Sequence, residues 1–149
     1  MINLIDRLTK KWDGIDHPFL IHPSRQLKFR DIASQLPIDL SIVNPGDSVA
    51  LIGDFDPSSI LTLLRLIDLG AIVVPLTKET KEQHQYFFES GLVDFVIEQG
   101  VLRKREHDVQ HELIDSLREK NHAGLVVFST GTTGRPKAIL HDLTLVLKK

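Results

Sequence analysis

The apolar residues of the chain fall into short continuous runs separated by longer stretches with helical spacing. The continuous runs are too short for helices and predict strands over residues 49–52, 71–74, 92–97 and 124–128. Apolar runs without polar alternation are typical of parallel strands covered on both faces. Helical spacing between them predicts helices over residues 57–69, 82–90 and 109–120. This alternation predicts an α/β fold, with a mostly parallel sheet and helices on both of its faces.

The helix over residues 57–69 has the clearest end signals. Asp56 is placed to cap its first turn, and Pro57 fits the first helical position. Gly70 fits the position just past its end. Apolar residues cover almost the whole circumference of this helix, so we expect it to be buried rather than to lie on the surface.

The remaining segments are shorter. Residues 2–12 place apolar side chains on one helical face and predict a docking helix, and residues 19–36 predict a hairpin followed by a short helix. Thr80 and Gln83 are placed for a capping box at the start of the second long helix. Residues 98–108 break the pattern and include three consecutive cations. We interpret them as a solvated connector rather than a nucleic-acid patch, because no aromatic residues are interleaved.

The composition is that of a globular protein and excludes several classes. The chain has 149 residues, 42% of them hydrophobic, which is enough for one domain with a core. A net charge of −2 gives no electrostatic reason to expect nucleic acid or an anionic membrane as a partner. There is no cysteine for disulfides or thiolate metal sites, and no apolar run approaches the ~20 residues of a membrane span. The N-terminus lacks the charged-then-apolar order of a signal peptide, so we expect a cytoplasmic protein.

The candidate chemistry lies in residues 129–137, between the apolar run that ends at Phe128 and a predicted return strand over 138–141. Their sequence, Ser-Thr-Gly-Thr-Thr-Gly-Arg-Pro-Lys, contains four hydroxyls, two glycines and two cations. Glycine permits positive φ and close approach, so successive N–H groups can converge on an anion, and Lys137 adds a full charge. The spacing predicts a loop that binds nucleotide phosphates. The alternative is a solvated hairpin turn, since the same residue types are common in turns.

This stretch, Ser129 to Lys137, resembles the phosphate-loop signature of the adenylate-forming superfamily. That superfamily comprises acyl-CoA synthetases, the adenylation domains of peptide synthetases, and luciferases. Residues 46–51 and 69–76 resemble two further stretches of the family in the expected order and spacing. The resemblance covers about residues 18–145. It implies that the chain folds as the first part of the large N-terminal domain of such an enzyme.

The resemblance also implies a reaction and a set of ligands. Family members activate a carboxylic acid with ATP, accompanied by Mg²⁺, to an acyl-adenylate and pass the acyl group to a thiol such as CoA or a carrier protein. Lys137 is the expected catalytic residue, because it would neutralise charge on the departing pyrophosphate. By the same analogy, the loop residues that contact the ATP phosphates are Ser129, Thr130, Gly131, Thr132, Thr133, Gly134 and Lys137.

Several other positions bear on the site. Ala138 and Leu143 depart from the family pattern, standing where glycine and, in many members, histidine are found. His141, at the far end of the return strand, has either a substrate-side role or the role of an ordinary strand-end residue. His107 and His111 have the i, i+4 spacing of helical metal ligands, but they lack a third ligand, so no metal site is predicted.

The family's later motifs, which bind adenine, ribose and magnesium, have no counterpart in the chain, and neither does its small C-terminal domain. We therefore expect residues 1–149 to be the incomplete first part of an adenylation domain that works with the remainder of its own polypeptide. Alone, the fragment should be inactive and should expose apolar surface that favours self-association. The alternative is a non-catalytic phosphate-binding or assembly module that retains the fold.

Overall fold

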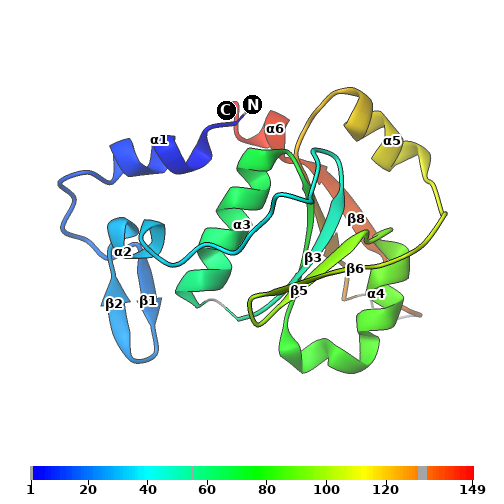
Figure 1. The fold of residues 1–149 in the computed structure, drawn as a ribbon, viewed down its shortest axis with the longest axis horizontal. Helices are drawn as coiled ribbons and strands as arrows, with labels where there is room; N and C mark the ends of the chain where they lie inside the picture. Colours follow the sequence, from blue (N-terminus) through cyan, green and yellow to red (C-terminus); the bar gives the residue numbers. More distant parts are fainter. Residues whose placement is uncertain (1, 55, 131–133) are drawn as a thin grey trace.

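The apolar runs form a six-stranded sheet at the centre of the structure, a computed structural model that describes residues 2–54, 56–130 and 134–149. Along the sheet the strands lie in the order β6-β5-β3-β4-β7-β8. The four inner strands are parallel, and β6 and β8 pair antiparallel at the two edges. The predicted mostly parallel sheet is confirmed (Figure 1). The strands are β3 (Ser48–Ile52), β4 (Ile72–Leu76), β5 (Phe95–Glu98), β6 (Val101–Lys104), β7 (Gly124–Phe128) and β8 (Ala138–Asp142).

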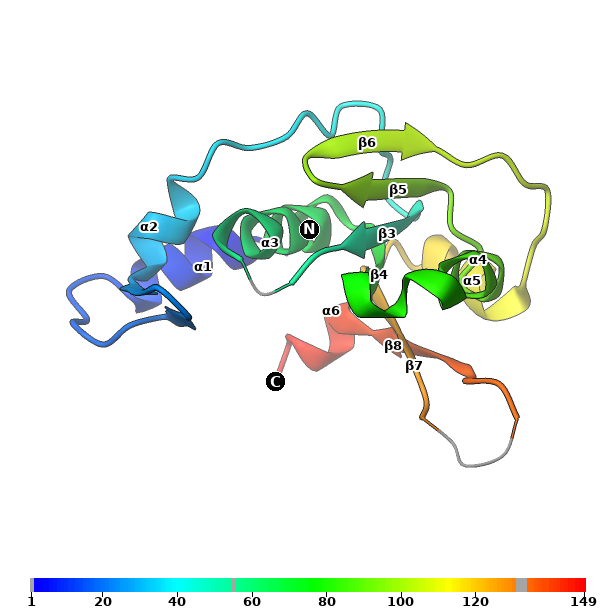
Figure 2. The same ribbon diagram turned by 90° about the horizontal axis from the view of Figure 1, so that it is seen from below.

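Alternate residues of the inner strands face opposite sides of the sheet, and helices cover each side. Val49 and Val73 pack with α3, α1 and α6, whereas Ala50 and Val74 pack with α4 and α5. Figure 2 shows α1 and α3 on one side of the sheet and α4 and α5 on the other. The prediction of helices on both faces is therefore confirmed. These helices are α1 (Leu4–Lys11), α3 (Pro57–Leu69), α4 (His84–Ser90), α5 (Glu112–Glu119) and α6 (Leu143–Val146).

The predicted burial of α3 is confirmed, because α3 lies between the sheet and an outer layer. Its first turn is capped by Asp56, whose Oδ1 accepts the Ser59 N–H at 2.9 Å. Its end is marked by Gly70 with φ +87°, a left-handed conformation that favours glycine. On the outer side, the Asp68 carboxylate accepts the backbone N–H groups at the start of α1. The end signals in the sequence therefore specify this helix correctly.

The outer layer contains the predicted N-terminal hairpin and short helix, and both are confirmed. Leu27 of the hairpin and Ile32 of the helix pack against Leu61 of α3. The Arg7 guanidinium of α1 donates to the Leu147 carbonyl at 3.3 Å and so joins the first helix to the segment after the last. The elements are β1 (Leu20–His22), β2 (Arg25–Leu27) and α2 (Phe29–Ala33).

The interpretation of residues 98–108 as a solvated connector is wrong for its first half, which forms the edge strand β6. A two-residue turn joins β5 to β6, with φ +50° at Gln99 and +74° at Gly100. Positive φ at both turn residues matches the twist of a tight hairpin. The residues of β6 are mostly exposed, and its charged side chains are typical of a sheet edge. Without a buried face, the strand leaves no clear signal in the hydrophobic pattern.

The predicted capping box at Thr80 and Gln83 is also wrong. A 3₁₀ helix, η1 (Lys78–Gln83), leads directly into α4, and no side chain caps the start of α4. Instead, the Thr80 hydroxyl donates to the Thr77 carbonyl at 3.0 Å. The buried His84 ring binds the same carbonyl through Nε2 at 2.9 Å. Thr80 and His84 therefore bind the backbone just after β4 instead of capping α4.

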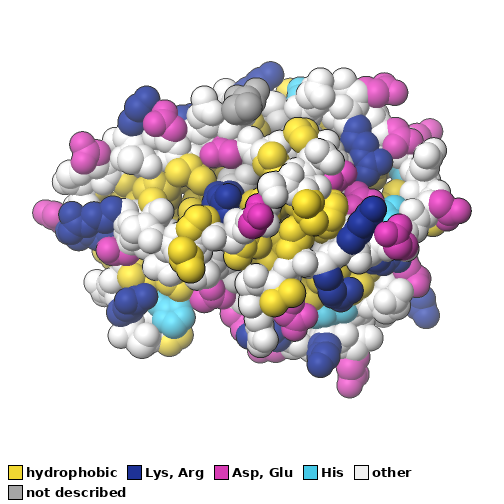
Figure 3. All heavy atoms as spheres, in the orientation of Figure 1, with side chains coloured by type: hydrophobic (Ala, Val, Ile, Leu, Met, Phe, Trp, Pro, Cys, Tyr) yellow, Lys and Arg dark blue, Asp and Glu magenta, His cyan; other side chains and the backbone are white. Residues whose placement is uncertain are grey.

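The surface mixes both signs of charge with exposed apolar side chains. Figure 3 shows apolar side chains gathered along the middle of the face that the connector between α2 and β3 crosses. Leu36 and Ile42, both in that connector, are exposed. None of the helices in the described part of the chain is long and apolar enough to pass through a bilayer.

Candidate functional site

The hairpin of β7 and β8 separates from the rest of the sheet towards the carboxyl end of β7. β7 pairs with β4 over only two residues, Gly124 and Leu125, whereas β8 pairs with all five residues of β7. The far half of the hairpin is therefore not hydrogen-bonded to β4. Figure 2 shows it projecting away from the other strands of the sheet. The predicted phosphate loop connects the projecting ends of these two strands.

Ser129 and Lys137 close the base of this loop. The Ser129 N–H donates to the Lys137 carbonyl at 2.9 Å, and the Lys137 N–H donates to Ser129 Oγ at 3.0 Å. Thr130 and Gly134 are exposed, and Gly134 has φ +79°. The structure thus brings together the first and last residues of the predicted site. Three of the predicted contacts lie outside the described residues, namely Gly131, Thr132 and Thr133.

The loop carries positive charge at its carboxyl end. The side chains of Arg135 and Lys137 are exposed. Within the described ranges, neither forms an ion pair with a carboxylate. Exposed cations beside hydroxyl and backbone N–H groups make a setting that favours anions such as phosphate.

Helix α4 holds the carboxyl end of the loop. The Tyr86 hydroxyl donates to the Pro136 carbonyl at 2.6 Å, and the Arg135 guanidinium lies 5.0 Å from the centre of the Tyr86 ring. Next to them, the centres of the Phe87 and Phe128 rings are 4.2 Å apart. Tyr86 is not among the residues predicted from the sequence, because it lies 50 residues before its partner Pro136. The available signal was a hydroxyl within an aromatic run of a predicted helix, since such a hydroxyl needs a partner when it is buried.

The loop lies at the edge of the sheet where open α/β sheets bind ligands. β3, β4 and β7 are parallel, so their carboxyl ends meet at one edge. The helices that follow β3 and β4 cover opposite faces, which opens a crevice between these two strand ends. A mostly apolar cavity of about 290 Å³ lies there. Its lining includes Leu51, Ile60, Leu63, Pro75 and Leu76.

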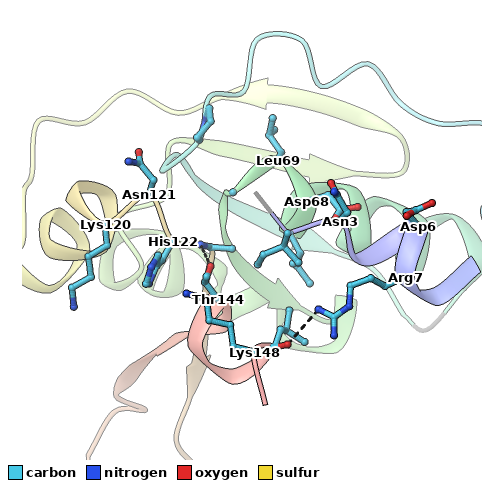
Figure 4. A pocket seen from close by; sticks show the side chains of 16 residues that line it. Asn3, Asp6, Arg7, Asp68, Leu69, Lys120, Asn121, His122, Thr144 and Lys148 are labelled. Carbon is cyan, nitrogen blue, oxygen red and sulfur yellow. Dashed lines mark hydrogen bonds between the residues drawn. The ribbon is translucent and has the colours of Figure 1, made fainter. Parts of the chain in front are cut away.

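A different cavity, of about 690 Å³, lies near the amino ends of β4 and β7, between α1, α6 and the turn before β7 (Figure 4). Its polar groups hold the surrounding elements together. Asp68 binds the start of α1, and the Thr144 hydroxyl accepts the Ala123 N–H at 3.0 Å. His122 Nδ1 lies 2.7 Å from Asp142 Oδ2. This cavity is therefore a junction of the N- and C-terminal helices, at the opposite end of the strands from the loop.

Asp142 anchors the open end of the β7–β8 hairpin, opposite the loop. Its Oδ1 accepts the Leu145 N–H at 3.0 Å and so caps α6. Burial raises the pKa of the Asp142 carboxyl, but the hydrogen bonds from the His122 side chain and the Leu145 N–H, together with the charge interactions of His122 and Lys120, outweigh that effect. The pKa therefore lies below its ordinary value, and the ionised form is the one that holds the hairpin end.

The histidines singled out in the sequence do not gather at the loop. His141 is exposed on β8, four residues from Lys137 and therefore about 13 Å along the strand. His107 Nε2 lies 2.7 Å from Asp94 Oδ1, and His111 caps the start of α5. Across the described residues, no group of three His, Cys, Asp or Glu side chains is placed to hold a metal ion.

The chain is similar to one curated protein in sequence and to several solved structures in fold. No family model matches the chain. Surfactin synthase subunit 1 from Bacillus subtilis is 22% identical over an alignment of 143 positions, and the alignment covers 84% of this chain and 4% of that protein. The N-terminal subdomain of Klebsiella oxytoca NpsA in complex with 3-hydroxybenzoyl-AMSN is similar with a TM-score of 0.61 and 18% identity. The similarity covers 93% of this chain and 39% of that structure.

A second solved structure is a coenzyme A synthetase. O-succinylbenzoate Coenzyme A Synthetase (MenE) from Bacillus subtilis, solved in complex with AMP, has a TM-score of 0.58 and 17% identity. The similarity covers 93% of this chain and 42% of that structure, so the chain spans less than half of either neighbour. The resemblance found in the sequence is confirmed at the level of the fold. The chain has the architecture of the N-terminal portion of adenylate-forming enzymes.

Proposed function

We infer from this fold that the chain is the opening part of an adenylate-forming ligase. In the longer protein, ATP and a carboxylic acid would react to an acyl-adenylate and pyrophosphate, and the acyl group would pass to a thiol of CoA or of a carrier protein. Both acceptor types are named among the similar structures. One is called a coenzyme A synthetase, and another is an artificially fused adenylation-PCP di-domain of a peptide synthetase from Klebsiella oxytoca.

The observation that carries this proposal is the arrangement at the base of the β7–β8 loop. Ser129 and Lys137 are bonded to each other at the carboxyl edge of the sheet, and Arg135 and Lys137 keep exposed charges beside them. In the proposed complex the loop would hold the β- and γ-phosphates of ATP through its hydroxyls and backbone N–H groups. Lys137 would lie against the pyrophosphate portion.

The chemistry assigns Lys137 an electrostatic role. A carboxylate oxygen of the acid would attack the α-phosphorus and form a new O–P bond. The bond from that phosphorus to the bridging oxygen would break, and pyrophosphate would leave with the electron pair. Negative charge therefore grows on the group that the loop holds, and a fixed cation stabilises the transition state more than the ground state. Mg²⁺ would accompany the ATP, as the family resemblance implies, and the family's magnesium-binding motif has no counterpart in residues 1–149.

The test is ATP–pyrophosphate exchange by the longer protein with a panel of carboxylic acids. Lys137→Ala should lower the exchange rate at least about tenfold, which corresponds to about 1.4 kcal/mol. The matched control is Lys104→Ala, because Lys104 is also an exposed cation on an edge hairpin of the same sheet. The control should leave the rate unchanged. The assay reports the first half-reaction alone, so it does not depend on the identity of the acceptor thiol.

Two results would count against the proposal. An unchanged exchange rate in Lys137→Ala would remove the role given to the loop. Exchange that is absent with every acid, while ATP still binds, would instead favour the non-catalytic phosphate-binding module.

A further inference from the structure

We propose that Tyr86 is a positioning residue that fixes Lys137 for its action on the leaving pyrophosphate. This inference rests on the proposed function and extends it to a residue outside the loop. Tyr86 lies on α4, is half-buried, and contacts the loop only through the two residues before Lys137 among the contacts that the structure describes. It therefore acts on the backbone from which the lysine side chain extends.

The contact pins a single peptide unit at both ends. The Pro136 carbonyl accepts the Tyr86 hydroxyl at 2.6 Å, and the N–H of the same peptide unit, which belongs to Lys137, donates to Ser129 Oγ at 3.0 Å. Because a peptide unit is planar, holding its oxygen and its N–H restricts the whole plane to rotation about the line between them. Hydrogen bonds arranged in such a chain also polarise and strengthen one another.

The hydroxyl and the ring of Tyr86 have separate partners. The hydroxyl binds Pro136, while the ring face lies under the Arg135 guanidinium, with 5.0 Å between the guanidinium carbon and the ring centre. A cation at this distance from an aromatic face is attracted to the ring. Tyr86→Phe therefore removes the hydrogen bond to the peptide unit and keeps the ring beneath Arg135.

The Lys137 side chain itself is exposed and makes no ion pair within the described part of the chain. The backbone therefore sets the point and the Cα–Cβ direction from which this flexible side chain reaches towards the phosphates. A cation that stabilises a departing group must be held in place before the reaction, since misplacement by about 1 Å can cost much of the rate. The pinned peptide supplies that constraint, and Tyr86 supplies one of its two anchors.

The test is a double-mutant cycle in the longer protein, measured by ATP–pyrophosphate exchange. Tyr86→Phe should lower kcat about fivefold, the effect expected of one lost hydrogen bond, with little change in the KM for ATP. The same substitution in a Lys137→Ala background should have almost no further effect, because the group that Tyr86 positions is gone. The control is Gln85→Ala, which removes a neighbouring side chain of α4 that is bonded to Glu89 at 3.1 Å. It should leave both constants unchanged.

The outcomes separate this inference from the proposed function. An unchanged kcat in Tyr86→Phe, or an equal fall in the wild-type and Lys137→Ala backgrounds, would overturn the positioning role. If Lys137→Ala lowers exchange while Tyr86→Phe does not, the proposed function stands and only the role of Tyr86 is lost. If Lys137→Ala itself has no effect, the proposed function fails first.

Discussion

The two lateral edges of the sheet carry antiparallel hairpins whose connections differ in length and in residue types. At one edge, β5 and β6 are joined by the two-residue turn of Gln99 and Gly100. At the other edge, β7 and β8 are joined by the segment from Ser129 to Lys137. The two-residue turn carries no hydroxyl and no cation, whereas the longer connection carries four hydroxyls and two cations. The proposed phosphate binding therefore rests on the residue types of the second connection, which a tight turn does not need.

The hairpins also differ in how firmly they are joined to the sheet. β5 pairs with β3 over four residues, from Val49 opposite Phe95 to Ile52 opposite Glu98. β7 pairs with β4 over two residues only. The carboxyl end of β7 is instead packed against α4, where the Phe87 ring contacts the Phe128 ring.

Helix α4 contacts both hairpins through a similar pair of residues. Arg103 of β6 lies 5.8 Å from the centre of the Phe88 ring, and Arg135 of the loop lies 5.0 Å from the centre of the Tyr86 ring. The tyrosine adds a hydroxyl that reaches the loop backbone. The two contacts thus share a cation and a ring, and only the one at the candidate site adds a directional hydrogen bond.

The largest effect is expected from Phe87→Ala, which removes the contact between α4 and the carboxyl end of β7. The Phe87 side chain is 5% exposed and belongs to the core on the α4 face of the sheet. Truncating it should lower the free energy of unfolding by about 3–5 kcal/mol, as measured by urea denaturation. The control on the other hairpin is Arg103→Ala, an exposed side chain whose loss should change stability by less than about 0.5 kcal/mol. Equal effects of the two substitutions would remove the distinction between the two hairpins.

A smaller effect is expected at the glycines of the two connections. Gly100 and Gly134 have φ of +74° and +79°, and an added Cβ would meet no atom within 4 Å at either position. Alanine at either site should therefore cost about 1–2 kcal/mol in unfolding, the price of a left-handed conformation alone. In the longer protein, only Gly134→Ala should also lower ATP–pyrophosphate exchange. A loss of exchange in Gly100→Ala would contradict the assignment of binding to the second hairpin.

The smallest expected change in stability is at Asp142, at the open end of the β7–β8 hairpin opposite the loop. Its folded pKa is lowered, so its contribution to stability is complete above the ordinary aspartate pKa of about 4 and is lost as pH falls through the folded value. Asp142→Asn keeps a capping side chain and should cost about 1 kcal/mol near neutral pH. Urea midpoints of both proteins, compared as the pH is lowered, should converge in acid. A difference that is constant with pH would show that the ionised carboxylate is not what holds this end.

Much of the fold is predictable from residues close together in the chain. The inner strands follow from continuous apolar runs, and α3 follows from Asp56 at its start and Gly70 at its end. The edge strand β6 is not predictable in this way, since its exposed and charged residues resemble a connector. For α5, the periodicity gives the helix and its buried Ile114, but the helix begins only at Glu112.

The candidate site also has a part that local sequence predicts and a part that depends on distant contacts. The loop and Lys137 stand out in the sequence because their residue types are concentrated in nine consecutive positions. The support from Tyr86 is invisible there, because it depends on α4 lying beside a segment 50 residues further along the chain. No local periodicity encodes a contact of that kind.

The sequence by itself determined the inner strands and the helices between them, the ends of α3, and the segment that carries the candidate chemistry. These features arise from backbone preferences, capping and apolar spacing, all of which act over a few residues. Only the tertiary structure decided that β7 leaves β4 after two residues and that α4 holds the loop it carries. Those outcomes depend on the packing of distant segments, and that packing is set by the shape of the whole core.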